Sequence, residues 1–187
     1  MDQDAYTAFA GQRLLAQGNL LEVAMAAWSA QGQDHLLVFD DATGRTVDLD
    51  LRGTQPEVAE RLGGQTPAKA ARGRPKLGVT AREVTLLPRQ WDWLATQPGG
   101  ASAALRRLVD QARRENVNAD LARQALKAAH RVMTTLAGDL PDFEESTRAF
   151  YARDYGRFRE ISSRWPDDVA SYVQVLVARV EQAQAGT

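Results

Sequence analysis

The chain has 187 residues, of which 44% are hydrophobic and 25% are charged, and its formal net charge is −1 at pH 7. This composition is typical of an ordinary globular protein and excludes a disordered or fibrous chain. The chain contains no cysteine, which excludes disulfides, thiolate nucleophiles and zinc–cysteine sites.

No apolar run approaches the roughly 20 residues that a membrane-spanning helix needs. The acidic start, MDQDAYTAFAG, is unlike the positively charged start of a secretory signal. We therefore expect a cytoplasmic protein that has no membrane partner.

Residues 1–64 predict a small α/β unit. AYTAFA and RLLAQ are expected to form two short strands around a turn at Gly11. NLLEVAMAAWSAQ is expected to form a helix capped by Asn19, with Glu22 placed to complete a capping box.

The same unit is expected to contain a hairpin over residues 35–52. Its second strand alternates apolar and polar side chains, and Gly44 suits the left-handed position of the turn. A short helix is predicted over 55–62, where Gly63-Gly64 ends it.

Residues 65–81 predict an exposed basic arm or linker. The segment 65–114 carries 10 basic and 3 acidic residues, whereas 1–64 carries 4 basic and 10 acidic residues and 115–187 carries 9 basic and 11 acidic residues. Positive charge concentrated in one part of a chain is typical of a nucleic-acid-binding surface.

Residues 82–115 predict a strand, REVTLL, followed by the helices PRQWDWLATQ and SAALRRLVDQARR, with Gly99-Gly100 as the turn between them. On the first helix, the spacing places Trp91 and Leu94 on the buried face and leaves Trp93 more exposed. This order of elements resembles a ribbon-helix-helix DNA-binding module.

The resemblance implies a homodimer, because the strand must pair with its twin from a second chain. It also implies that the two-stranded ribbon enters the major groove and that the start of the second helix holds a phosphate. Gly100, Ala101 and Ser102 are the candidate phosphate contacts, with Ser102 as the expected N-cap.

The register of the ribbon stays open. One register presents Arg82, Val84 and Leu86 to the groove, and the other presents Glu83, Thr85 and Leu87. Base edges are recognised by hydrogen bonds, so Arg82 and Thr85 are the candidate base contacts. The alternative is a ribbon that only dimerises the protein.

Arg72-Gly73-Arg74-Pro75 resembles the core of an AT-hook, with Lys69 before it and Lys76 after it. The resemblance implies that these six residues bind DNA, with the arginines in the narrow minor groove of AT-rich sequence. The alternative is a flexible basic linker.

Residues 116–187 predict a helical bundle. Asn118 is expected to cap its first helix, Pro141 and Pro166 to open later helices, and Val169, Val173, Leu176 and Val180 to form the buried stripe of the last one. The predicted fold class is therefore α+β, with an N-terminal α/β unit, a central dimer module and a C-terminal helical bundle.

The chain as a whole also resembles a bacterial family, domain of unknown function 2239. The resemblance covers most of the length, through TAFAGQRLLAQGNLLEVA, FDDATGRTVDLDLRG, RGRPKLGV, REVTLLPRQWDWLATQPGGAS and AGDLPDFEE. It implies a bacterial, cytoplasmic origin and assigns no site residue.

An enzyme is the rival interpretation, and the residues favour it poorly. His35 and His130 have no partner at metal-ligand spacing, and no nucleophile elbow, P-loop or dinucleotide fingerprint occurs. The Asp40-Asp41 pair is interpreted as turn chemistry, and the acidic residues at 142–145 as charge at a helix N-terminus. We expect no catalytic residue, metal or cofactor.

The sequence thus predicts a dimeric DNA-binding protein, either a bacterial transcriptional regulator or a nucleoid-associated protein. The alternative is a non-enzymatic interaction module, antitoxin-like or effector-binding, that uses the ribbon only to dimerise. Its protein partner would bind the N-terminal unit or the C-terminal helices.

Overall fold

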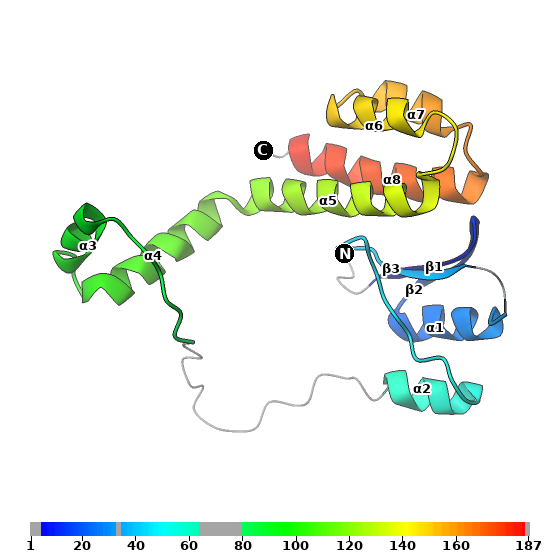
Figure 1. The fold of residues 1–187 in the computed structure, drawn as a ribbon, viewed down its shortest axis with the longest axis horizontal. Helices are drawn as coiled ribbons and strands as arrows, with labels where there is room; N and C mark the ends of the chain where they lie inside the picture. The colour runs from blue at the N-terminus through cyan, green and yellow to red at the C-terminus, as the bar shows by residue number, and fades with distance from the viewer. Residues whose placement is uncertain (1–4, 33–34, 64–79, 186–187) are drawn as a thin grey trace. The chain divides into compact units, whose positions relative to one another are not determined.

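The computed structural model describes residues 5–32, 35–63 and 80–185 (Figure 1). The chain forms two compact units: residues 1–66 together with 118–187, called unit 1 here, and residues 67–117, called unit 2. The sequence prediction separates residues 1–64 from 116–187, whereas in unit 1 the two segments share one hydrophobic core. Among the described residues, no helix is long and apolar enough to span a bilayer.

Unit 1 is built around a small antiparallel sheet with the strand order β2-β1-β3-β4. The strands are β1 (Tyr6–Ala10), β2 (Arg13–Gly18), β3 (Leu36–Asp40) and β4 (Arg45–Thr46). Helix α1 and then α2 lie on one side of the sheet, and α5 and α8 lie on the other, with α6 and α7 outermost (Figure 1). The fold is thus α+β and mostly helical.

Alternation along the central strands gives the sheet two buried faces. Phe9 and Phe39 are fully buried against the helical bundle. Ala8 and Val38, one residue earlier in each strand, belong to a second apolar cluster with α1. A sheet covered on both faces in this way needs residues from both ends of the chain.

Helices α1 (Leu20–Ser29) and α2 (Gln55–Gly63) begin and end close to their predicted positions. The Asn19 side chain accepts a hydrogen bond from the Glu22 amide, and the Glu22 carboxylate accepts one from the Asn19 amide, each at 3.0 Å. This reciprocal pair confirms the predicted capping box.

The predicted hairpin over 35–52 forms, but its second strand is shorter than expected. Pairing stops after Thr46 and the Val47 amide, which donates to the Val38 carbonyl at 2.8 Å. The alternation nevertheless persists in the packing, because Val47, Leu49 and Leu51 lie against the α1 cluster while the residues between them are exposed. The apolar pattern therefore predicted correctly which side chains pack inward, but it predicted a longer paired strand than the chain forms.

The helical part of unit 1 consists of α5 (Val117–Ala137), α6 (Phe143–Tyr151), α7 (Tyr155–Ser162) and α8 (Asp167–Ala185). The predicted apolar stripe of α8 is fully buried, as are Phe150 and Phe158. Two predicted helix starts are displaced: α5 begins one residue before Asn118, and α6 begins after Asp142 rather than at Pro141. Turn conformation over 139–142, with Asp142 at φ 61°, keeps Pro141 outside the helix.

A buried carboxylate ties the sheet to α8. The Thr7 hydroxyl and the Tyr172 hydroxyl both donate to Asp41 Oδ1, at 2.8 and 2.7 Å, and the Arg179 guanidinium lies 3.9 Å from Oδ2. Burial and the neighbouring carboxylate raise the pKa of Tyr172, so its hydroxyl stays protonated and keeps donating. At the β2 edge of the sheet, Asp168 of α8 accepts a hydrogen bond from the Leu14 amide at 2.8 Å.

Candidate nucleic-acid interface

Six of the predicted DNA contacts lie outside the described residues. They are Lys69, Arg72, Gly73, Arg74, Pro75 and Lys76, all within the segment 64–79. The structure therefore bears on the remaining candidates, which are Arg82, Thr85 and the start of the second helix of unit 2.

The predicted ribbon segment, residues 82–87, is assigned to neither a helix nor a strand in the single chain. Arg82 and Thr85 are exposed, as is every other residue of the segment except the half-buried Leu86. A lone strand has no ladder without a partner strand, so the ribbon and its register stay predictions. At its end, the Leu87 amide donates to the Gln90 side chain at 2.8 Å, which fixes the start of the next helix.

Unit 2 contains a helical hairpin of α3 (Pro88–Ala95) and α4 (Gly100–Glu115). Gly99 and Gly100 make the turn with φ values of 82° and 75°, a left-handed conformation that glycine adopts without strain. The Arg107 guanidinium donates to the Pro98 carbonyl at 2.9 Å and holds the turn against α4.

The start of α4 differs from the prediction in two respects. The N-cap position is Gly99 rather than Ser102, and Ser102 lies inside the first turn of a helix that begins at Gly100. The Gly100 amide already donates to the Gln97 carbonyl at 3.0 Å. Of the three proposed phosphate donors, Ala101 and Ser102 keep first-turn amides, which have no helical carbonyl to bond.

The described part of unit 2, residues 80–117, buries very few of its side chains. Leu94 and Ala104, each 3% exposed, are the only buried residues between 80 and 117. The prediction for Leu94 is confirmed and that for Trp93 also holds, but Trp91 is 41% exposed rather than buried. A two-helix hairpin offers a single contact face, which Leu94 fills, and Trp91 finds no further surface in the same chain.

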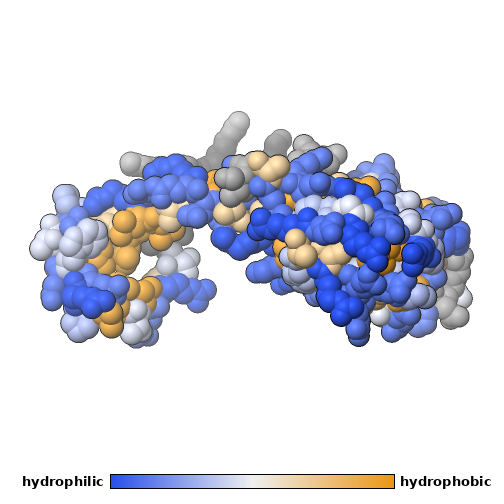
Figure 2. All heavy atoms as spheres, turned by 90° about the horizontal axis from the view of Figure 1, so that it is seen from above, coloured by the Kyte–Doolittle hydropathy of each residue, from blue (hydrophilic) through white to orange (hydrophobic). Residues whose placement is uncertain are grey.

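Large apolar side chains are exposed along the described part of unit 2, and Figure 2 shows hydrophobic residues gathered over α3 and α4. Seven of the eleven exposed large hydrophobics among the described residues lie in unit 2: Val84, Leu87, Trp91, Trp93, Leu108, Val109 and Val117. Exposed apolar side chains concentrated in one part of a protein in this way are typical of interaction surfaces.

Arginines flank this apolar surface. At 100° per residue, Arg106 and Arg113 share one side of α4, and Arg107 and Arg114 share the other. Between α3 and α4 lies an open groove of about 380 Å³, lined by Trp93, Leu108, both residues of the second arginine pair and neighbouring polar side chains. Apart from that of Arg107, the arginine guanidinium groups between residues 80 and 117 form no ion pair or hydrogen bond with any described residue.

The acidic residues considered for an enzyme are held in structural contacts. The Asp40 carboxylate accepts hydrogen bonds from the Ala42 amide at 2.9 Å and the Thr43 hydroxyl at 2.9 Å, as turn chemistry predicts. Glu145 pairs with Arg157 at 2.6 Å, and the hydrogen bond from this guanidinium lowers the pKa of Glu145. Among the described residues, no group of three or more metal-ligating side chains could hold a metal ion.

Sequence reasoning missed the role of Asp41. The carboxylate is only 7% exposed and serves two hydroxyl donors, although the sequence shows it beside an ordinary turn residue. An apolar strand that ends in Asp-Asp is the one local signal available, and it does not reveal that Tyr172, 131 residues away, is the partner.

The fold is thus that of a mixed α+β protein that carries an exposed, arginine-flanked helical hairpin. A family model described as "uncharacterized protein conserved in bacteria (DUF2239)" matches residues 5–177, and the chain belongs to that family. Comparison with curated proteins and with solved structures finds no match.

Proposed function

We propose that this protein binds DNA as a homodimer joined through unit 2, and that the basic arm (residues 65–81) adds contacts to the DNA. The observation that carries the proposal is the surface of unit 2. Its described part exposes apolar side chains and arginines together, and it buries only two side chains.

The apolar surface supports a dimer. Helix α3 has eight residues, which is shorter than the roughly 12–15 at which an isolated helix becomes even marginally stable in water. Its packing against α4 rests mainly on Leu94 and Ala104, so further burial must come from another molecule. A second copy fits best, because one two-fold contact would pair residues 82–87 with their twin and cover both apolar surfaces at once.

The arginines support DNA as the ligand of that dimer. The described part of unit 2, residues 80–117, contains six arginines, no lysine and four acidic residues, and the arm adds two lysines and two arginines. Guanidinium groups that lack carboxylate partners are suited to bidentate contact with phosphate oxygens. Arg82 and Thr85 are the proposed base contacts, and the amides of Ala101 and Ser102 are proposed phosphate contacts.

Fluorescence anisotropy of the full chain on AT-rich and GC-rich duplexes, measured over a range of salt concentrations, tests the proposal. Replacing Arg72 and Arg74 together by alanine removes up to four charges per dimer, so the slope of log affinity against log salt should fall by roughly 2–4. AT-rich DNA should lose the most affinity, because arginine gains most in a narrow minor groove.

The matched control replaces the same two residues by lysine. It should keep most of the salt slope and lose the AT preference, since the charge remains but the planar guanidinium does not. A wild-type chain that forms a stable dimer but shows no salt-sensitive DNA binding would refute the proposal. That result would favour the alternative, a protein-interaction module that uses the ribbon only to dimerise.

A further inference from the structure

A second cationic surface lies in unit 1, away from the residues discussed so far. It is an open cleft of about 500 Å³ between the β3–β4 turn and α5. Its lining residues are Gly44, Arg45, Thr46, His130, Arg131, Thr134 and Thr135. The lining thus contains two arginines, one histidine and three threonines, and no carboxylate.

Close backbone packing holds the two walls of this cleft together. A Cβ placed on Gly44 would lie 2.3 Å from the Ala128 carbonyl oxygen, so only glycine allows the turn to approach α5 this closely. One turn further along α5, the Arg131 guanidinium donates to the Thr43 carbonyl at 2.8 Å. The cleft is therefore a fixed feature of unit 1, with Arg131 anchored over the turn.

Several donors of the cleft have unused hydrogen-bonding capacity. The Arg45 guanidinium forms no ion pair or hydrogen bond with any described residue. Asp40, which lies opposite Arg45 in the hairpin, is occupied by the turn amides and the Thr43 hydroxyl. His130 Nδ1 is buried without a partner among the described residues.

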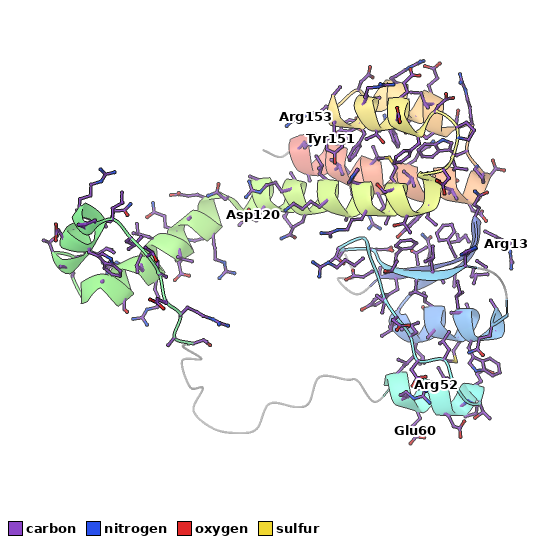
Figure 3. The ribbon with its side chains drawn as sticks, in the orientation of Figure 1. Arg13, Arg52, Glu60, Asp120, Tyr151 and Arg153 are labelled. Atoms are coloured by element: carbon purple, nitrogen blue, oxygen red, sulfur yellow. The ribbon has the colours of Figure 1, made fainter. Side chains whose placement is uncertain are left out.

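The imidazole of His130 is held in place by an aromatic neighbour. Its ring centroid lies 5.5 Å from that of Tyr151, which stands at the end of α6 beside Arg153 (Figure 3). This contact positions a side chain whose buried nitrogen makes no hydrogen bond within the described part of unit 1. A buried polar atom of this kind gains when a ligand supplies the missing partner.

Two guanidiniums that line one cleft repel each other unless a negative charge is shared between them. An oxyanion with several acceptor oxygens would relieve the repulsion and accept hydrogen bonds from both groups and from the Thr134 hydroxyl. We propose that this cleft binds a phosphate group, with Arg45 and Arg131 as its charged ligands. The proposal does not depend on the DNA-binding role of unit 2.

Two sources could supply the phosphate: a free phosphate or phosphorylated small molecule, or the backbone of bound DNA. Isothermal titration of the full chain with inorganic phosphate and pyrophosphate tests the first source. Arg45→Ala should weaken binding about tenfold or more, because it removes a charge-assisted hydrogen bond. Since Arg45 is exposed and its guanidinium forms no ion pair or hydrogen bond with a described residue, the variant should fold as the wild type does.

Arg123→Ala is the matched control, since Arg123 is an exposed arginine of α5 that pairs with Asp120 and does not line the cleft. It removes the same charge and should leave phosphate affinity unchanged. In the DNA titration, Arg45→Ala should lower the slope of log affinity against log salt by about 1 per chain, while Arg123→Ala should not change it.

The phosphate titration and the DNA titration together distinguish the two sources of the phosphate group. Phosphate binding that Arg45→Ala weakens selectively identifies a free ligand, and a selective change in the DNA salt slope alone identifies the DNA backbone. The proposal would be overturned if Arg45→Ala, Arg123→Ala and the wild type had the same phosphate affinity and the same DNA salt slope. The phosphate titration needs no DNA, so failure of the proposed DNA binding would not be mistaken for failure of this site.

Discussion

Replacing Gly44 by alanine should destabilise unit 1 by more than backbone strain alone explains. Gly44 has φ +64°, and a left-handed conformation costs an alanine roughly 1–2 kcal/mol. The added Cβ would also lie 2.3 Å from the Ala128 carbonyl oxygen and 2.7 Å from the Ala128 Cα. Both atoms belong to a helix backbone, so the turn itself must move.

Gly11→Ala is a matched control for this variant. Gly11 has nearly the same conformation, φ +59°, also sits in a tight turn between two strands, and has nothing within 4 Å of an added Cβ. Gly11→Ala should therefore lose only the stability that backbone strain costs, because its added Cβ makes no steric clash. Forcing extra atoms into a packed contact typically costs about 1–3 kcal/mol, and that is the expected difference between the two variants.

Urea unfolding followed by circular dichroism at a helical wavelength measures both variants. For a chain of this size, a difference of 1–3 kcal/mol corresponds to roughly 2–12 °C in Tm, which thermal unfolding would resolve. Equal losses for Gly44→Ala and Gly11→Ala would refute the reasoning. They would mean that the β3–β4 turn does not lie tightly against α5, and the phosphate cleft would lose its fixed geometry.

Three further perturbations have defined outcomes. Thr85→Pro should convert the dimer to a monomer in light scattering, since proline removes a donor from the paired strand, whereas Ala81→Pro, just outside it, should not. Tyr172→Phe should lower the free energy of unfolding by about 1.5–3 kcal/mol, because it removes a hydrogen bond to the buried Asp41 carboxylate. Tyr151 is half exposed, so Tyr151→Phe should lower it by under about 0.5 kcal/mol. The pKa of Tyr172 is raised in the folded state, so wild-type stability should fall as the pH rises above about 10, and Tyr172→Phe should flatten that fall in urea titrations.

Local patterns in the sequence predicted the elements of unit 1 well. Asn19 and Glu22 form the predicted capping box, and the α8 stripe beginning at Val169 is buried as its spacing indicates. Alternation over 47–51 predicted which side chains are buried. These features depend on neighbours a few residues apart, which a sequence displays directly.

Features that depend on distant partners could not be predicted in the same way. The Asp41–Tyr172 contact joins residues 131 positions apart, and the sequence around either residue does not indicate that the other is its partner. The exposure of Trp91 is a related case. Helical spacing places it on an apolar face, but whether that face is covered depends on a second surface, which the described residues of the chain do not supply.

This contrast between the two units bears on how binding and folding are linked. In unit 1, both faces of the sheet are covered and the polar atoms of Asp41, Asp168 and Tyr172 are satisfied within the chain. In unit 2, α3 is too short to be stable by itself and buries little besides Leu94. If a second copy completes unit 2, its helices become fully stable only in the dimer, because the apolar burial that opposes chain entropy is supplied across the interface. The DNA affinity of a dilute sample should then depend on protein concentration, since the surface that presents the arginines forms only when two chains meet.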